Sequence, residues 1–437
     1  MDDKPLYYDP FDPACREGLF ETYARLHKEA PVYHTETGWW IVSTMDDVHT
    51  IHTSPHLFSN RNNGSETLIP AVDPDNEALA DRLRPVFEKM LLDTQELLRA
   101  TVIVGADPPV HTTHRNCVNR AFTRGRVEAL RGFVESVVAS CLEEIDTAET
   151  FEVSDDLACI IPLRVMERLF DLPEVDSNNF KRWAYALGAQ LDADVARGSV
   201  ESYGRHFDLL KEFSDYFVPI FNERQKNPGS DLISDIMSGG DDIITVSEAV
   251  LFVLTLLAAG VETTANLIGN VITALMRHPD QLQMVIDDPS LVKAAVEESL
   301  RYDSPFQFSF REAAQDVVLS GVTIPKGGQI ILLIGAANHD AKHFPNPDSY
   351  DLTRATAGHV GFGHGIHFCL GVSLARMEAQ IAVREIASRL PEFALDEDGL
   401  VEGNGLLLWG RRKIPLARKR PAVSASASVT EGVAVSS

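Results

Sequence analysis

The chain has 437 residues, a formal net charge of −25 and a hydrophobic fraction of 44%. A chain this acidic lacks the cationic face that nucleic acids and anionic membranes attract, so we expect neither as a partner. Its apolar content suffices for a hydrophobic core, which excludes disorder along the whole length.

The first 109 residues mix helix, strand and irregular chain. Periodicity predicts a helix over Leu19–Glu29 and two short strands within residues 31–43, joined by a turn at Gly38. Residues 60–109 show no clear period, and glycines and prolines, Pro85 among them, interrupt any long element. Such a stretch is either functional or a flexible surface insertion.

After residue 109 the pattern is helix-rich. Helical periodicity or long apolar runs predict helices over residues 110–121, 127–147, 179–187, 202–225, 247–277, 291–301 and 375–390. Weak strands at 317–323 and 329–334 flank a turn. Because these elements interleave without a linker, we expect a mainly α fold with a small β portion, in one large domain over residues 1–420. The small, polar residues 421–437 are predicted to be a disordered tail.

The cysteines and the chain start bear on the compartment. The five cysteines are scattered without a C-x-x-C, which predicts neither a disulfide framework nor a structural zinc cluster. The first residues, MDDKPLYYDPFDP, lack the apolar segment of a signal peptide. The longest apolar run, residues 249–261, ends at Glu262 and is shorter than the roughly 18 residues of a membrane span. We therefore expect a cytoplasmic protein.

Residues 360–371, VGFGHGIHFCLG, are the most informative segment. Their glycines permit positive φ values and close approach to a planar ligand. Cys369 precedes a helix expected to begin near Ser373, where the helix dipole and free N–H groups stabilise a thiolate. The segment suits a thiolate metal ligand, and a buried structural cysteine is the alternative. A dinucleotide loop would need glycine at Ile366 or Phe368, and a nucleophile elbow would need glycine instead of Ala375.

FGHGIHFCLG resembles the haem-binding loop of the cytochrome P-450 superfamily, here of the bacterial haem-thiolate monooxygenase type. Four further segments follow in the order of that family. They are residues 107–115 (DPPVHTTHR), which resemble D-P-P-x-H-x-x-x-R; 259–264 (AGVETT), which resemble its distal-helix motif; 298–301 (ESLR), which resemble E-x-x-R; and 347–354 (PDSYDLTR), which resemble the segment before the cysteine loop. The resemblance implies haem between a long distal helix and the proximal Cys loop and helix.

The resemblance implies a haem b cofactor, with O2 as co-substrate. Cys369 would be the axial ligand of the iron, and a thiolate there favours cleavage of the O–O bond, as is general for haem-thiolate enzymes. Phe362 and Gly363 would contact the haem near the sulfur. His111 and Arg115 are four residues apart and share a helix face. The haem propionates would bind His111, Arg115, Arg311 and His367, and a solvated His–Arg pair is the alternative for the first two.

The apolar run ends in an acid beside a hydroxyl. Burying Glu262 is costly unless something uses it, and Thr263 can hydrogen-bond back to a helix carbonyl. The resemblance implies an oxygen groove in which Glu262 relays protons, Thr263 holds the group that receives them and Gly260 leaves room for a small ligand. Many relatives carry aspartate at the acid position. A structurally paired Glu262 is the alternative.

Glu298 and Arg301 are spaced to form a salt bridge on one helix. By resemblance, Arg354 completes this network. We interpret these three residues as structural, holding the loop that presents Cys369.

The family layout implies a substrate pocket that includes Ala258, Ala259, Phe306, Phe308 and Leu407. These residues are apolar, which suggests a hydrophobic substrate such as a terpenoid, steroid, fatty acid or polyketide-like molecule. Ordinary core packing is the alternative for several of them. The implied reaction is hydroxylation or epoxidation with one atom of O2.

No flavin or iron–sulfur motif is present in the sequence, so the electrons are expected from a separate ferredoxin and its reductase. A local basic patch on the thiolate side could receive the ferredoxin, against the alternative of merely solvated arginines. It comprises Arg115, Arg120, Arg124, Arg126 and Arg376. By analogy with the family we expect a monomer. Two alternatives remain, a peroxide-using relative and a non-catalytic haem-thiolate protein that binds a ligand or senses gas.

Overall fold

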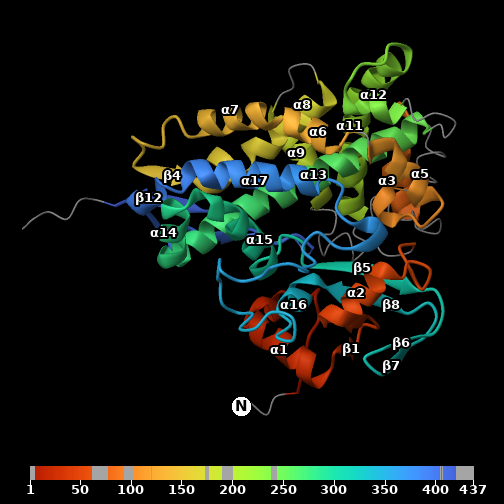
Figure 1. Cartoon of the computed structure of the whole chain (residues 1–437). Helices are drawn as coiled ribbons and strands as arrows, with labels where there is room; N and C mark the ends of the chain where they lie inside the picture. Colours follow the sequence, from red (N-terminus) through yellow and green to blue (C-terminus); the bar gives the residue numbers. More distant parts are fainter. Residues whose placement is uncertain are drawn as a thin grey trace, which may run out of the picture.

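The computed structural model describes residues 5–61, 77–92, 102–119, 121–172, 177–188, 200–237, 244–403, 405 and 407–419. Helices make up the larger, upper body in Figure 1, and a sheet with a few helices makes up the lower body. The fold is therefore mainly α with a small β portion, as the sequence predicts. The predicted tail, residues 421–437, lies outside the described residues.

The helices match most of the predicted ranges. They are α1 Leu19–Glu29, α2 Met45–Thr53, α3 Glu77–Phe87, α5 Val110–Asn119, α6 Arg124–Ala129, α7 Arg131–Cys141, α8 Ile160–Phe170, α9 Ser177–Gly188, α11 Val200–Lys226, α12 Leu232–Met237, α13 Val246–Arg277, α14 Pro279–Asp287, α15 Val292–Tyr302, α16 Ile334–Asn338 and α17 Val372–Ile386. Two predictions are wrong in detail. Residues 127–147 hold two helices with a break at Leu130, and α3 forms within the stretch expected to be irregular, with Pro85 in its last turn.

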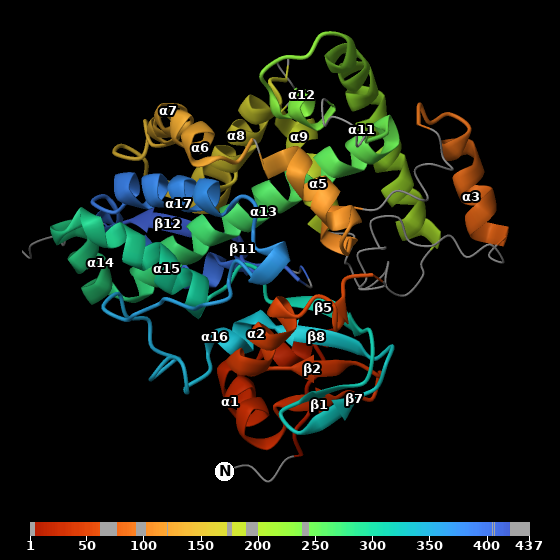
Figure 2. The same ribbon diagram turned by 45° about the vertical axis from the view of Figure 1, so that its right-hand side comes forward.

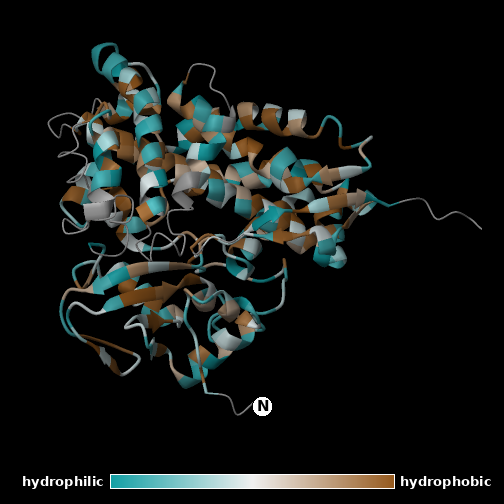
Figure 3. Ribbon diagram, turned by 180° about the vertical axis from the view of Figure 1, so that it is seen from behind, coloured by the Kyte–Doolittle hydropathy of each residue, from teal (hydrophilic) through white to brown (hydrophobic). Residues whose placement is uncertain are grey.

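The main sheet lies in the lower body. Its strand order is β1 (Val32–His34), β2 (Trp40–Val42), β8 (Gln329–Leu333), β5 (Phe308–Ala313) and β3 (Phe58–Ser59). The pair β2–β8 is parallel and the other neighbours are antiparallel. In β5 and β8, Arg311 lies opposite Ile330 and Phe308 opposite Leu333. Figure 3 shows both hydrophobic and hydrophilic stretches in this sheet.

Shorter strands complete the β portion. The strands β4 (Thr150–Glu152), β12 (Pro415–Arg418) and β9 (Phe393–Leu395) form one sheet. Two hairpins consist of β6 (Val317–Leu319) with β7 (Val322–Ile324), and of β10 (Val401–Glu402) with β11 (Arg411–Lys413). The first hairpin lies where one strand was predicted for residues 317–323.

The helix α13 is the centre of the helical body. A capping box begins it: Glu248 N–H donates to Thr245 Oγ1 and Thr245 N–H donates to the Glu248 carboxylate. With 32 residues, α13 is long and apolar enough to cross a membrane, yet 61% of its most apolar window is buried inside the protein. It is thus an interior helix, and α17 packs against it (Figures 1 and 2).

Candidate functional site

The cysteine loop lies between the main sheet and α17. Gly363 and Gly365 adopt φ values of 68° and 69°, which favour glycine. A Cβ at Gly365 would come within 2.1 Å of the His52 carbonyl oxygen, so the loop packs directly on α2. The N–H of Cys369 donates to the Phe362 carbonyl over 3.0 Å. The positive φ values that the sequence predicts are confirmed, and the absence of a side chain at Gly365 also allows the loop to pack on α2.

Burial dominates the electrostatics of Cys369. It raises the pKa of the Cys369 thiol, and the Gly371 N–H, Arg115 and Arg376 lower that pKa only in part. For the thiol without a metal, desolvation therefore outweighs the stabilisation that the helix start gives to a thiolate. A metal cation at the sulfur would reverse the balance, since a coordinating thiol is deprotonated.

The four predicted basic residues converge near the loop. The rings of His111 and His367 have centroids 4.3 Å apart. Arg115 Nη2 donates to the Phe368 carbonyl over 2.7 Å. Burial lowers the pKa of His367 to about 2, with further lowering from Arg311, His111 and Arg115, in that order. The structure thus brings together all four residues for which the sequence predicts a common anionic ligand.

Within the described ranges, these basic groups have few anionic neighbours. Arg311 is only 7% exposed, and among the described residues its hydrogen bond goes to the Phe310 carbonyl. Burial lowers the pKa of Arg311 to about 10, and the charge of Asp107 opposes this shift. His111 Nε2 is buried and has no hydrogen-bond partner in the described part of the chain. Buried cations without a matching charge are costly, so this cluster suits an anionic ligand.

Sequence reasoning missed two residues of this cluster. Both ring nitrogens of His52 are buried and unpartnered within the described ranges, and burial followed by Arg311 lowers its pKa to about 3. Asn60 Nδ2 contacts His367 Nε2. His52 lies on α2 and Asn60 directly after β3, far from the recognised motifs. No local pattern marks either residue, because only the tertiary fold places them here.

The acid and the hydroxyl lie on α13. Thr263 Oγ1 donates to the Ala259 carbonyl over 2.6 Å, the back-bond that the sequence predicts. Burial raises the pKa of Glu262 to about 7, and Arg412 opposes that shift. The role of Gly260 toward a small ligand stays a prediction, and the structure shows what a side chain at this position would meet. A Cβ there would meet Met166 Sδ on α8 at 3.1 Å, so glycine at this position allows two helices to pack closely.

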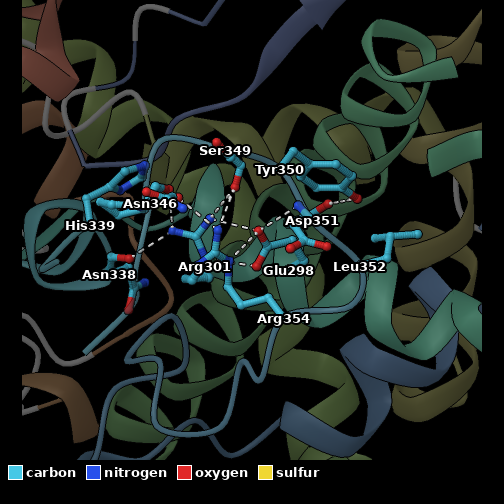
Figure 4. A network of polar contacts seen from close by, with 12 residues as sticks. Glu298, Arg301, Asn338, His339, Asn346, Ser349, Tyr350, Asp351, Leu352 and Arg354 are labelled. Atoms are coloured by element: carbon cyan, nitrogen blue, oxygen red, sulfur yellow. Dashed lines mark hydrogen bonds and ion pairs between the residues drawn. The ribbon is translucent and has the colours of Figure 1, made fainter. Parts of the chain in front are cut away.

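The predicted structural network forms in the structure, with Glu298 and Arg301 fully buried and Arg354 at its partly exposed edge (Figure 4). Arg301 donates to both Glu298 carboxylate oxygens over 2.8 Å, and both side chains are 0% exposed. Arg354 Nε donates to Glu298 Oε1 over 3.3 Å. Arg301 also donates to the carbonyls of Asn338, Pro347 and Ser349. One carboxylate thus ties α15 to the chain that leads toward the cysteine loop.

The five predicted pocket residues separate into two groups. Ala259 is exposed although it lies on an interior helix, and Ala258 and Phe306 are half-buried. Phe308 and Leu407 are 1% and 8% exposed and belong to a core cluster with Tyr23 and Leu26. For Phe308 and Leu407 the structure favours core packing over the predicted pocket role. Strand alternation explains the case of Phe308, because Ser309 and not Phe308 shares the β5 face of Arg311.

Comparison with known proteins decides the family. The cytochrome P450 family model matches residues 76–398. The chain belongs to the cytochrome P450 family. It is 34% identical over 422 residues to cytochrome P450 107B1 of Saccharopolyspora erythraea, with 93% of this chain and 96% of the relative covered. It is 34% identical over 405 residues to 6-deoxyerythronolide B hydroxylase of the same organism, with 91% and 95% covered.

Solved structures agree with this assignment. This cytochrome P450 matches P450BioI, crystallised with an acyl carrier protein that carries hexadec-9Z-enoic acid. The TM-score is 0.79 and the identity 29%, with 92% of this chain and 99% of that chain covered. The chain is therefore a cytochrome P450 monooxygenase with haem b as cofactor and O2 as co-substrate. The residues present fit haem. The desolvated Cys369 thiol suits the iron, and the buried cations, which have few anionic neighbours among the described residues, suit the propionates.

Proposed function

We propose that this cytochrome P450 inserts one atom of O2 into a hydrophobic small molecule, using electrons from a separate ferredoxin and its reductase. The observation that carries the proposal is the Glu262–Thr263 pair on the interior helix α13, with the pKa of Glu262 raised to about 7 by burial. A carboxyl that titrates near neutral pH can both accept and release protons during turnover. A protein that only binds a ligand has no need of such a group.

The proposed haem contacts follow from the buried cations and the loop. Cys369 would be the axial ligand, with Phe362 and Gly363 beside it on the loop. His111, Arg115, Arg311 and His367 would hold the propionates, which supply the charge that these cations lack. When bound, haem supplies the activation of O2 that monooxygenation requires. Glu298, Arg301 and Arg354 would hold the loop without touching the reacting atoms.

In this proposal the residues of α13 manage protons. Glu262 takes a proton from the solvent side, where Arg412 opposes the rise in its pKa, and passes it inward. Thr263 Oγ1 donates to the Ala259 carbonyl in the resting protein, and during turnover this hydroxyl would give up that bond to pass on the proton that it receives from Glu262. This hydrogen bond holds the Thr263 side chain in one rotamer beside the exposed Ala259.

The substrate class rests on relatives and on the apolar lining. One relative is named a hydroxylase of 6-deoxyerythronolide B, and one structural neighbour holds a carrier-bound hexadecenoic acid. We propose a substrate of this hydrophobic kind, within the range of terpenoids, steroids, fatty acids and polyketide-like molecules. Ala258, Ala259 and Phe306 are the pocket residues that the proposal retains.

The electron donor would dock where cations remain available on the surface. Arg376 and Arg126 already have ion-pair partners, Glu297 and Asp235, and Arg120 lies outside the described residues. This leaves Arg124 as the residue of the basic patch best suited to a test.

The proposal also includes a single domain over residues 1–420. The enzyme would be a cytoplasmic monomer without a nucleic-acid or membrane partner.

The test is a reconstituted turnover. The purified holoenzyme is mixed with a ferredoxin, its reductase, NADPH and one candidate from each hydrophobic class, under isotopically labelled O2. The proposal expects product that contains one labelled oxygen atom and depends on the ferredoxin. Product formed only with added peroxide would favour the peroxide-using alternative. Ligand binding without product from any class would favour the non-catalytic alternative.

A further inference from the structure

Three side chains from separate parts of the chain meet beside the cysteine loop. Glu297 lies on α15, His359 lies ahead of the loop, and Arg376 lies on α17. Arg376 Nε donates to Glu297 Oε1 over 2.6 Å and its Nη2 donates to Oε2 over 2.7 Å. His359 Nε2 lies 3.0 Å from Glu297 Oε2. One carboxylate therefore joins two helices and the loop segment between them in the sequence.

A short chain of contacts connects this carboxylate to Cys369. The Arg376 guanidinium carbon lies 4.8 Å from the centroid of the Phe362 ring. Phe362 in turn accepts the Cys369 N–H at its carbonyl oxygen over 3.0 Å. On the other arm, the Gly361 N–H donates to His359 Nδ1 over 3.1 Å. The contacts of Arg376 and of His359 thus both reach the loop backbone at residues 361 and 362, and Phe362 is hydrogen-bonded to Cys369.

The loop has little freedom to move away from α15. A Cβ at Gly361 would lie 2.8 Å from the Leu300 carbonyl oxygen, so the loop backbone rests directly on that helix. The side chains of His359 and Glu297 are 5% and 23% exposed, which limits competition from water. A shift of the carboxylate would therefore move the loop.

The carboxylate is held in its charged form. Burial alone would raise the pKa of Glu297, but hydrogen bonds from His359 and Arg376 and the charge of Arg376 outweigh it and lower that pKa to about 2. The bidentate Arg–carboxylate geometry is the strong, directional form of this contact. The Glu297 carboxylate thus stays ionised over the working pH range of most enzymes. We define the clamp as Glu297, His359 and Arg376.

The clamp is separate from the network around Glu298. The two adjacent glutamates of α15 accept from different arginines, Arg376 for one and Arg301 with Arg354 for the other. Glu298 fixes the chain that precedes residue 354, whereas Glu297 reaches the loop itself.

We propose that Glu297 is a positioning residue that, through His359 and Arg376, fixes the Phe362–Cys369 backbone hydrogen bond and so the direction of the sulfur toward the iron. This inference rests on the proposed ligation of haem by Cys369 and adds a determinant of its geometry.

The experiment compares reduced carbon monoxide spectra and haem reduction potentials of purified holoenzymes. For Glu297→Ala we expect haem to be retained, the potential to shift and the thiolate-type band to be lost faster than in the parent. Partners that orient a metal ligand typically contribute about tenfold or more to metal affinity, so we expect an effect of that order. Glu297→Gln, which keeps an acceptor oxygen but no charge, should lie between Glu297→Ala and the parent. The matched control is Glu135→Ala. It removes the exposed ion pair between Glu135 on α7 and Arg384 on α17, the helix that also carries Arg376. Both readouts should stay unchanged in this variant.

A second variant guards against misfolding. Arg376→Lys keeps the charge but loses the bidentate contact, and it should shift the potential in the same direction as Glu297→Ala. Parent-like potential and band lifetime in any folded member of the set Glu297→Ala and Arg376→Lys would overturn the proposal. A parent enzyme that itself lacks the thiolate-type band would overturn the proposed function together with this inference, whereas a normal parent band with unchanged variants would overturn this inference alone.

Discussion

Thr263 donates through Oγ1 to the carbonyl oxygen of Ala259, four residues earlier on α13, over 2.6 Å. The bond satisfies a hydroxyl on an otherwise apolar helix and fixes its rotamer. Because Ala259 is exposed although α13 is an interior helix, the hydroxyl is held at the edge of accessible space.

Thr263→Ala is expected to uncouple electron use from product. Without the hydroxyl, proton delivery loses its final donor, so NADPH consumption continues while product per NADPH falls about tenfold or more, within the range of a lost proton-transfer group. The measurement is the ratio of product to NADPH consumed. Thr263→Ser is the control and should keep most of the coupling. Unchanged coupling in Thr263→Ala would contradict the assigned role.

Glu262 predicts a pH dependence. With its pKa near 7 in the folded enzyme, its protonated fraction falls as pH rises through that value. Coupled turnover should therefore decline above about pH 7, and the Glu262→Gln profile should lose this inflection while its rate falls about 10²-fold or more. An inflection that persists in Glu262→Gln would assign the titration to another group.

The same carboxyl also predicts a stability difference. A glutamate whose pKa rises on folding stabilises the fold when protonated, fully below its ordinary value of 4.5, and loses that contribution as pH rises through about 7. Glu262→Gln should thus match the parent melting temperature at about pH 5 and exceed it at about pH 8.5. Glu378, whose pKa burial raises to about 8, acts in the same sense but is common to both proteins. Equal melting temperatures at both pH values would contradict the account.

Arg311→Met is expected to act in opposite directions on the two forms of the protein. The apoprotein should become no less stable, because a buried cation whose hydrogen bond is to a carbonyl is removed. Haem affinity should fall about 10- to 100-fold, the equivalent of one charge-assisted hydrogen bond. Thermal unfolding of the apoprotein and haem titration measure the two effects. A variant that loses apoprotein stability and keeps full haem affinity would show that Arg311 serves the fold.

Glu298→Ala should impair assembly. The substitution leaves the buried Arg301 without its carboxylate partner and removes one contact of Arg354. This should lower the free energy of unfolding by roughly 3–5 kcal/mol. We expect little haem in the purified variant, as measured by the ratio of Soret to protein absorbance. A variant with full haem and a parent-like spectrum would remove Glu298 from the account of loop support.

Arg124→Glu tests the ferredoxin surface. Reduction by ferredoxin should slow, and the difference from the parent should shrink as salt rises, because charge complementarity acts on association. Stopped-flow reduction at several salt concentrations measures this. Arg384→Glu, on the far part of α17, is the control for a change in net charge. Equal kinetics for the parent and Arg124→Glu at low salt would exclude this docking surface.

Local sequence predicted the parts of this protein that local chemistry determines. The glycine pattern around Cys369 and the i,i+4 pair His111 and Arg115 carry their geometry in their spacing. Helices such as Leu19–Glu29 follow from periodicity alone. The boundaries of α17 and the long α13 were likewise close to the prediction.

The remaining features depend on contacts far apart in the sequence. The family layout implies Phe308 in the pocket, but the face that a β5 side chain takes depends on the pairing of β5 with β8, which local sequence does not specify. His52 and Asn60 join the basic cluster only through the packing of α2 and β3, and Glu297 reaches Arg376 across 79 positions. The sequence predicts that Pro85 interrupts a helix, whereas the last turn of α3 accommodates it.

The most direct test of the central claim is the carbon monoxide spectrum of the reduced protein, recorded for the parent and for Cys369→Ser. The account predicts a strongly red-shifted Soret band in the parent and the loss of that band in the variant. A parent band typical of histidine-ligated haem, or a red-shifted band that survives in Cys369→Ser, would contradict it.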